Sequence, residues 1–321
     1  MKPELLLNAS AIKSAKGCTL KLVRILQGYH EQIRWNDTEF GSAGHVGIET
    51  YEKTKDADLA TLKAMSAFKK ASKDPNFKVR NKKDWLTRSY LAAVMEAFYH
   101  AREQGEFSEY KPIDTTTQGL LVEKTFKIPF YKGDYVDISL CGTIDSIERI
   151  GRDGIYLAAD YKFTSQWNIW GFLNGFRLSP QLLFYITALR LLAEKYPDSI
   201  FAEIAKARIG GQIRGIFLKS DLSVTCKASD VWQFREEDLE AFRVQLNLLC
   251  LNIALYYRDI KDEESTTWSK SGLITNACEG VYGYPCMFLE ACSVPERAEK
   301  YELKKIPRKE YNPLSFRKEE E

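Results

Sequence analysis

The sequence predicts an α/β fold in which a central mixed β-sheet is flanked by helices. Residues 135–150 and 154–162 are rich in β-branched and apolar side chains, and turn-forming residues separate the two runs at Gly151-Arg152-Asp153-Gly154. These runs predict two adjacent antiparallel strands. Segments with the apolar spacing of amphipathic helices lie before and after them. The combination predicts a single α/β domain.

The remaining elements follow the chain in order. Ser10 is expected to cap a first helix, and Ser179-Pro180 is expected to begin a later helix that carries Gln181 and Tyr185 four residues apart on one face. Helices are expected at about 10–30, from the Phe40–Glu49 segment to about Ala71, and at 85–103, 179–196 and 236–259. Strands are expected at 118–130, 135–150, 154–162 and 211–219, with another at 224–234.

The size and composition of the chain are those of a soluble globular protein. It has 321 residues, of which 45% are hydrophobic and 28% charged, with a formal net charge of +2. We expect one domain over residues 1–295 and a charged tail over 296–321. No run of about eighteen apolar residues occurs, and the N-terminus lacks a signal-peptide pattern, so a cytoplasmic location and no membrane association are expected.

The segment that carries the chemistry is Gly142-Thr143-Ile144-Asp145, followed by Asp160-Tyr161-Lys162. If the two strands pair, Asp145 and Asp160 approach the same end of the sheet, and strand alternation places Lys162 on the face of Asp160. Two carboxylates and an ammonium group suit a Mg²⁺ or Mn²⁺ site for phosphodiester hydrolysis. The alternative is a salt-bridged strand end, and the acidic-x-Lys pattern alone is weak evidence because it recurs at Asp259 and Glu302.

Two further residues are candidates for the same site. His45 follows Gly41-Ser42-Ala43-Gly44 near a helix start, and Glu49 lies one turn further on the same face. His45 could ligate a metal or bond a neighbouring backbone group. Glu123 lies in an otherwise apolar predicted strand, where it is either exposed at a sheet edge or part of the metal region.

Two other segments could contact nucleic acid. Between Glu52 and Arg88 the chain has eleven Lys or Arg residues against five acidic ones, a surplus that could bind a phosphate backbone or belong to a solvated helix face. Residues 163–176 contain Trp167, Trp170, Phe172 and Phe176. These aromatic side chains could stack unpaired bases or pack over the sheet.

The seven cysteines are expected to be core residues or metal ligands rather than disulfides. Cys141 lies in a predicted strand and Cys250 in an apolar helix, so both are expected in the core. Cys226 lies in a predicted strand and has no evident partner. Cys18, Cys278, Cys286 and Cys292 remain as candidate ligands.

Taken together, the ordered motifs resemble the RecB-like branch of the PD-(D/E)xK nucleases. That branch includes the AddB and RecB nuclease domains, CRISPR-associated RecB-like exonucleases and many phage-encoded proteins. No single motif is specific; the resemblance rests on the order of four motifs over about residues 10–292, namely Gly41-x-x-x-His45, Gly142-x-x-Asp145, Asp160-x-Lys162 and Gln181-x-x-x-Tyr185.

The resemblance implies a restriction-endonuclease-like core and a role for each matching residue. His45, Asp145 and Asp160 would bind Mg²⁺ or Mn²⁺, and Lys162 would assist the attacking water. Gln181 and Tyr185 would support the site or contact DNA, and Glu123 is a weaker correspondence.

Part of this family also carries a [4Fe–4S] cluster held by one N-terminal and three C-terminal cysteines. The resemblance therefore implies a cluster at Cys18, Cys278, Cys286 and Cys292, although the interval from Cys278 to Cys286 is longer than the family's common spacing. Zinc held by the same four thiolates, or dispersed thiols, are the alternatives.

The expected function is metal-dependent DNA cleavage in replication, recombination or repair, with an exonuclease on single strands or DNA ends favoured. A helicase or recombination protein could act as partner. Two alternatives stay open: a catalytically idle nuclease-like subunit for DNA binding or assembly, and an endonuclease for branched or duplex DNA. The intact Asp145, Asp160 and Lys162 argue against the idle subunit.

Overall fold

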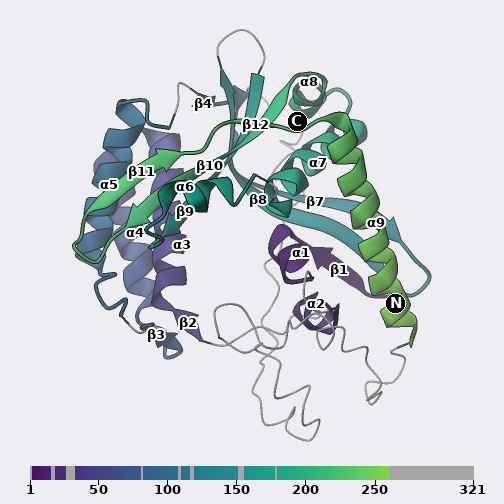
Figure 1. Cartoon of the computed structure of the whole chain (residues 1–321), viewed down its shortest axis with the longest axis horizontal. Coiled ribbons are helices and arrows are strands. Elements are labelled where there is room, and N and C mark those ends of the chain that lie inside the picture. Colours follow the sequence, from purple (N-terminus) through teal and green to yellow (C-terminus); the bar gives the residue numbers. More distant parts are fainter. Residues whose placement is uncertain are drawn as a thin grey trace, which may run out of the picture. The chain divides into compact units, whose positions relative to one another are not determined.

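The computed structural model shows a mixed α/β protein (Figure 1). It divides into two compact units, and three of the boundaries fall within strands β7 (Val122–Lys132) and β8 (Asp137–Ile150) and at the start of helix α9 (Glu236–Asp259). The structure describes residues 2–15, 19–26, 33–80, 82–107, 110–115, 119–150, 155–177 and 179–259. Within these, unit 1 spans 2–26, 126–142 and 237–259, and unit 2 spans 33–125 and 143–236.

Unit 2 contains the mixed central sheet that the sequence predicts. Strand β9 (Ile155–Thr164) pairs antiparallel with β8 and parallel with β10 (Ile209–Leu218), and β10 pairs antiparallel with β11 (Val224–Ala228). Every residue of β10 is buried, as expected for a strand covered on both faces. The short strands of this unit are β2 (Arg34–Trp35), β3 (Phe77–Lys78), β4 (Lys111–Pro112), β5 (Asp114–Thr115), β6 (Gly119–Leu120) and β12 (Trp232–Gln233).

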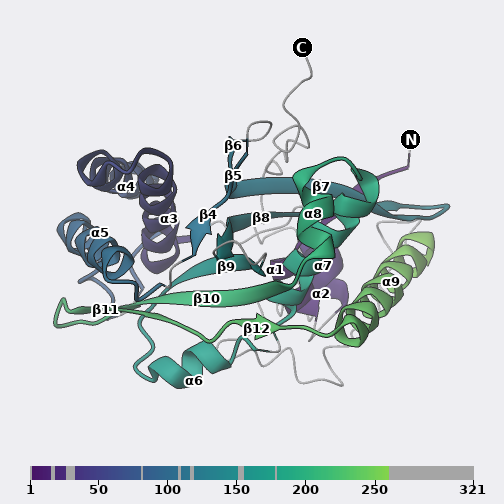
Figure 2. The same ribbon diagram turned by 90° about the horizontal axis from the view of Figure 1, so that it is seen from above.

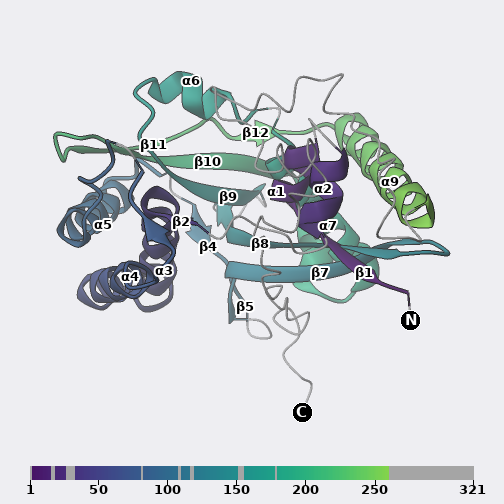
Figure 3. The same cartoon turned by 90° about the horizontal axis from the view of Figure 1, so that it is seen from below.

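Three helices cover one face of this sheet: α3 (Asn36–Thr54), α4 (Ala57–Ala71) and α5 (Arg88–Glu103). Figures 2 and 3 show them on the side of β9, β10 and β11 opposite to α6 (Ile169–Asn174). Tyr161 of β9 and Ile216 of β10 belong to the apolar core that these three helices form.

The other face of β9 and β10 packs against α6 and α7 (Pro180–Lys195), and α7 packs in turn against α8 (Ile200–Lys206). Ile213 and Phe217 of β10 contact Leu173 of α6 and Leu182 of α7. Because Asp160 is the register partner of Ile213, the side chain of Asp160 lies on this second face.

Unit 1 is smaller. Strand β1 (Glu4–Leu7) pairs in parallel with the first part of β8, and Lys127 of β7 forms an ion pair with Glu4, with 2.6 Å between Nζ and Oε2. The unit also contains helices α1 (Ala9–Ala15) and α2 (Thr19–Leu26) and the helix α9 (Glu236–Asp259) from its second residue onward.

Several predicted elements differ in detail. The helix expected up to Ala71 is two helices, because Lys55 adopts a left-handed conformation with φ of 57° and Asp56 caps α4, its Oδ1 accepting a hydrogen bond from Leu59 N at 2.8 Å. Asn8, rather than Ser10, caps α1, because its Oδ1 accepts from Ala11 N at 2.8 Å. The strand expected at 224–234 is the two short strands β11 and β12.

Cys141 and Cys250 are buried, as the sequence predicts, and so is Cys226. The other four cysteines and the charged tail lie outside the described residues. Within the part of the chain that the structure describes, no helix is both long enough and apolar enough to span a membrane.

Candidate active site

The site begins where helix α3 approaches strand β9. A Cβ atom at Gly44 would lie 2.2 Å from Cζ of Phe163, so only glycine allows the helix to come this close. The rings of His45 and Phe163 then pack edge to face, with centroids 5.6 Å apart. The glycine and the phenylalanine together place His45 beside the polar residues of the sheet.

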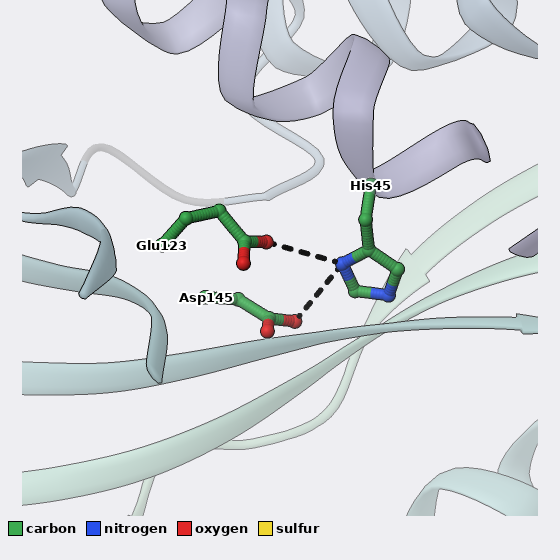
Figure 4. A group of neighbouring side chains, drawn as sticks. All are labelled: His45, Glu123 and Asp145. Atoms are coloured by element: carbon green, nitrogen blue, oxygen red, sulfur yellow. Dashed lines mark ion pairs between the residues drawn. The ribbon is translucent and has the colours of Figure 1, made fainter. Parts of the chain in front are cut away.

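His45, Glu123 and Asp145 meet at one point (Figure 4). Nδ1 of His45 lies 3.4 Å from Oε1 of Glu123 and 3.5 Å from Oδ2 of Asp145. One ligand atom from each residue lies within 4.8 Å of the others. Helix α3 contributes the imidazole, while β7 and β8 contribute the carboxylates. An imidazole and two carboxylates are a suitable donor set for a divalent cation.

Glu123 has an unusual backbone conformation. Its φ is 50°, in the left-handed region that residues other than glycine rarely adopt. This conformation breaks the regular alternation of side chains near the start of β7, where Val122 is buried. The sequence left open whether Glu123 faces solvent or the metal region, and the structure places it in the cluster with His45. Of the four residues other than glycine with positive φ in the described part of the chain, Glu123 is the one that belongs to the cluster with His45.

Asp145 is held by the backbone of the neighbouring strand. Its Oδ2 accepts a hydrogen bond from the main-chain N–H of Tyr161 at 2.7 Å. Tyr161 stands between Asp160 and Lys162 in the sequence, so this bond ties Asp145 directly to the Asp160-x-Lys162 motif. A main-chain donor has no signature in a sequence, and this contact could not have been predicted from one.

The two carboxylate oxygens of Asp160 lie in different environments. Its side chain is 1% exposed, and Oδ1 accepts a hydrogen bond from Nε2 of Gln181 at 2.7 Å. Nζ of Lys162 lies 2.5 Å from Oδ2 and forms an ion pair with it. A carboxylate oxygen has more than one lone pair, so Oδ2 could accept a metal ion in addition to Lys162.

Helix α7 supports Asp160 through the Gln181-x-x-x-Tyr185 motif. Nε2 of Gln181 donates to the hydroxyl of Tyr185 at 3.0 Å as well as to Asp160. The four-residue interval places both side chains on the same face of the helix. The helix itself begins as the sequence predicts, with Pro180 at its first turn and the hydroxyl of Ser179 accepting a hydrogen bond from Gln181 N.

Burial and charge crowding displace the pKa values of this cluster. Burial raises the pKa of Asp145, and the attraction of His45 and Lys162 only partly offsets it. Burial also raises the pKa of Asp160, to about 6, against the attraction of Lys162. Burial lowers the pKa of His45, but Asp145 and Glu123 outweigh it and raise the pKa to about 9. In the same way, burial lowers the pKa of Lys162 but Asp160 and Asp145 raise it above its ordinary value.

The structure thus sorts the predicted residues into two linked groups. His45, Glu123 and Asp145 form one, and the group around Asp160 forms the other, with Lys162, Gln181 and Tyr185. Glu49, one turn from His45, forms an ion pair with Lys53 and is not in the cluster of three ligands. The sequence singled out Gly41, while the closer approach to β9 is at Gly44; the small-residue run Gly41-Ser42-Ala43-Gly44 was the available signal.

Residues 7–292 match the sequence model of the PD-(D/E)XK nuclease superfamily. The match covers most of the chain, and the protein belongs to this superfamily. No individually curated protein matches the sequence. The α/β fold with its central mixed sheet agrees with the family, whose members are metal-dependent nucleases. The acidic cluster provides a location for a divalent metal ion.

The residues present fit such a metal ion. Three carboxylates, at Glu123, Asp145 and Asp160, face two cationic groups, Lys162 and the imidazole of His45, which leaves one negative charge in excess. The donor atoms are oxygens and one imidazole nitrogen, which suit Mg²⁺ or Mn²⁺ better than metals that prefer thiolates.

Proposed function

We propose that the protein is a Mg²⁺- or Mn²⁺-dependent deoxyribonuclease, acting as an exonuclease on single-stranded DNA or DNA ends. The observation that carries this proposal is the link between the two groups of the site. His45, Glu123 and Asp145 converge within 4.8 Å, and Asp145 is hydrogen-bonded to the residue between Asp160 and Lys162. A metal-ligand set therefore adjoins a buried acid–lysine pair in a chain of a nuclease family.

Each residue has a chemical part in the proposal. His45, Asp145 and Asp160 would hold the metal, with Glu123 as an additional ligand. The bound ion would neutralise charge on the phosphate and lower the pKa of water. Gln181 keeps one oxygen of Asp160 occupied and leaves the other oriented toward Lys162. Lys162 would orient the attacking water and add positive charge where negative charge develops on the phosphate.

A cleavage assay with four DNA substrates distinguishes the proposed exonuclease from an endonuclease and from a catalytically idle subunit. Purified protein is incubated with circular and linear DNA, single- and double-stranded, in Mg²⁺, Mn²⁺ or EDTA. The proposal expects degradation of linear single strands or ends, and none in EDTA. Cleavage of closed circles would instead support the endonuclease, and binding without cleavage in either metal would support the idle subunit. Cleavage that persists in excess EDTA would overturn the metal site.

The order of the four motifs supports membership of the RecB-like branch. In this setting we propose action in DNA replication, recombination or repair in the cytoplasm, with a helicase or recombination protein as partner. Co-purification of the tagged full chain with such a protein tests the partnership. Failure of this test would leave the cleavage chemistry unaffected.

We also propose a [4Fe–4S] cluster at Cys18, Cys278, Cys286 and Cys292, with a four-thiolate zinc site as the alternative. The support is the resemblance to the RecB-like branch, part of which holds such a cluster with one N-terminal and three C-terminal cysteines, an arrangement that these four positions match in order. Protein purified without oxygen should be brown, with broad absorption at about 400 nm. Elemental analysis that finds zinc and no iron would replace the cluster with zinc, and finding neither would discard both.

A further inference from the structure

Two tryptophans that follow Lys162 in the sequence, Trp167 and Trp170, are exposed. The exposed fraction is 87% for Trp167 and 59% for Trp170. They lie at and just before helix α6, in the segment that follows Lys162 along the chain. Two large aromatic side chains that are exposed to water do not contribute the stability that their burial in the core would give. A binding role would explain their position.

The other aromatic side chains of the segment anchor the helix. Phe172 packs against Phe176 and Phe217, with ring centroids 5.1 and 5.6 Å apart, and Leu173 is fully buried in the same cluster. The sequence left open whether this segment packs on the sheet or stacks bases. The structure divides it: the phenylalanines pack on the sheet, while Trp167 and Trp170 are exposed.

The turn before α6 is also fixed by hydrogen bonds. Oδ1 of Asn168 accepts from Gly171 N at 2.9 Å, and the hydroxyl of Thr164 accepts from Gln166 N at 3.2 Å. The backbone that carries the tryptophans is therefore held at both ends. A preorganised aromatic surface loses little entropy when a ligand stacks on it.

The local charge suits a polyanion. The chain has no Asp or Glu between Asp160 and Glu194, while Lys162 and the exposed Arg177 lie in this interval. A nucleic-acid strand could approach here without repulsion from carboxylates of this segment.

The surface is within reach of the candidate active site. Lys162 is the register partner of Gly215 on β10, and a Cβ at Gly215 would lie 3.3 Å from Leu173 of α6. Four residues lie between Lys162 and Trp167, so five Cα–Cα steps limit the distance between their Cα atoms to about 18 Å. That length corresponds to roughly five nucleotides at the rise of one strand in a duplex.

We propose that Trp167 and Trp170 form a stacking surface for the unpaired bases of single-stranded DNA as it enters or leaves the active site. This inference rests on the proposed nuclease function and specifies its substrate class. Stacking accepts any base, because every base presents an aromatic face, so little sequence preference is expected. Paired bases in an intact duplex do not present these faces to the tryptophans.

Binding without cleavage tests the surface. A labelled single strand of about 20 nucleotides and the matching duplex are titrated by fluorescence anisotropy in EDTA. Trp167→Ala and Trp170→Ala should each weaken single-strand binding about tenfold and leave duplex binding nearly unchanged. Trp167→Tyr should keep most of the affinity. The salt dependence of binding should not change, since no phosphate contact is removed.

The controls separate this inference from the nuclease function. Leu248→Ala, at a residue of α9 that is 49% exposed, should leave both affinities unchanged. Asp160→Ala should abolish cleavage but retain single-strand binding. Single-strand affinities within twofold of the wild type in both tryptophan-to-alanine variants would overturn the stacking surface and leave the nuclease standing. Tryptophan-dependent binding without cleavage in Mg²⁺ or Mn²⁺ would support the stacking surface and overturn the proposed nuclease function.

Discussion

Two clusters of buried ionisable residues share the same strands but differ in charge balance. One is the candidate active site. The other lies on the opposite face of β9 and β10, where Arg214 makes a double ion pair with Glu148, with Nη1–Oε1 at 2.7 Å and Nη2–Oε2 at 2.5 Å. Arg214 also donates to the hydroxyl of Tyr161 at 2.7 Å. Asp160 and Tyr161 are consecutive residues of β9, so their side chains lie on opposite faces of the strand.

The second cluster is balanced. Arg102 extends it, with Nε 2.8 Å from Oε1 of Glu52, and Lys55 pairs with the same carboxylate. Two carboxylates thus meet two guanidinium groups and a lysine. Burial raises the pKa of Glu52, but Arg102 and Lys55 outweigh it and hold the pKa below its ordinary value.

The candidate active site has the opposite pattern. Its buried carboxyls, Asp145 and Asp160, have raised pKa values despite the neighbouring Lys162. Both clusters contain buried carboxylates, so the balance of charge, rather than burial, is what differs between them. In the candidate active site a divalent cation would supply the positive charge that arginines supply in the other cluster.

The largest effect is expected at Asp160. Asp160→Asn should lower the cleavage rate by roughly a thousandfold or more, because it removes a charged metal ligand while preserving the shape and the bond to Gln181. The matched control is Asp221→Asn, at an exposed carboxylate that bonds Ser223. Equal losses of single-turnover rate in both variants would contradict the assignment.

The balanced cluster should affect stability rather than chemistry. Arg214→Met leaves Glu148 buried without its main partner and should lower the free energy of unfolding by about 3–5 kcal/mol. The double variant Arg214→Met with Glu148→Leu should recover much of this loss. Denaturant titrations in EDTA and in Mg²⁺ should give the same difference from wild type. A difference that depended on Mg²⁺ would place the metal at the wrong cluster.

The pH dependence of the metal-free protein should show the charge deficit directly. Because the pKa of Asp160 is about 6 when folded and 3.8 ordinarily, the protonated carboxyl favours the folded state. This stabilisation is complete below pH 3.8 and is lost as the pH rises through 6. The two pKa values differ by about 2, which corresponds to about 3 kcal/mol. In EDTA, Asp160→Asn should therefore flatten this part of the stability profile, and an unchanged slope would contradict the raised pKa.

Lys162 should give the smallest of these effects. Lys162→Ala should reduce turnover by about a hundredfold, because it removes positive charge near the developing phosphate charge. Its affinity for Mn²⁺ should stay the same or improve slightly, since a neighbouring cation is lost. Calorimetric titration and steady-state rates measure the two quantities separately. Wild-type turnover in this variant would remove Lys162 from the mechanism.

The sequence predicted the central strands, and it indicated the candidate residues that the structure brings close together, because both signals are local. Alternating and continuous apolar runs marked β8, β9 and β10, and short motifs marked Asp145, Asp160 and Lys162. It could not predict contacts that depend on tertiary structure. The bond from the backbone of Tyr161 to Asp145 is one such contact.

Other features were ambiguous for the same reason. Glu123 and the aromatic segment each allowed two environments, because a single strand or loop does not reveal what packs against it. The sequence did not predict the break between α3 and α4 at Lys55. Lys55 adopts a left-handed conformation that glycine usually adopts at the end of a helix, and no glycine marks this position. The ion pair of Glu148 with Arg214 joins residues far apart in the chain, and no pattern in the sequence indicated it.

The most direct test of the central claim is the stability of the full chain with and without Mg²⁺, compared for the wild type, Asp145→Asn and Glu148→Gln. At a hundredfold excess of Mg²⁺ over its dissociation constant, the wild type should gain about 3 kcal/mol. Asp145→Asn, which keeps an acceptor for Tyr161 N, should lose most of this gain. Glu148→Gln should keep the gain, although its free energy of unfolding without Mg²⁺ should be lower than that of the wild type. No gain in the wild type, or an equal gain in Asp145→Asn, would contradict a metal ion at this cluster.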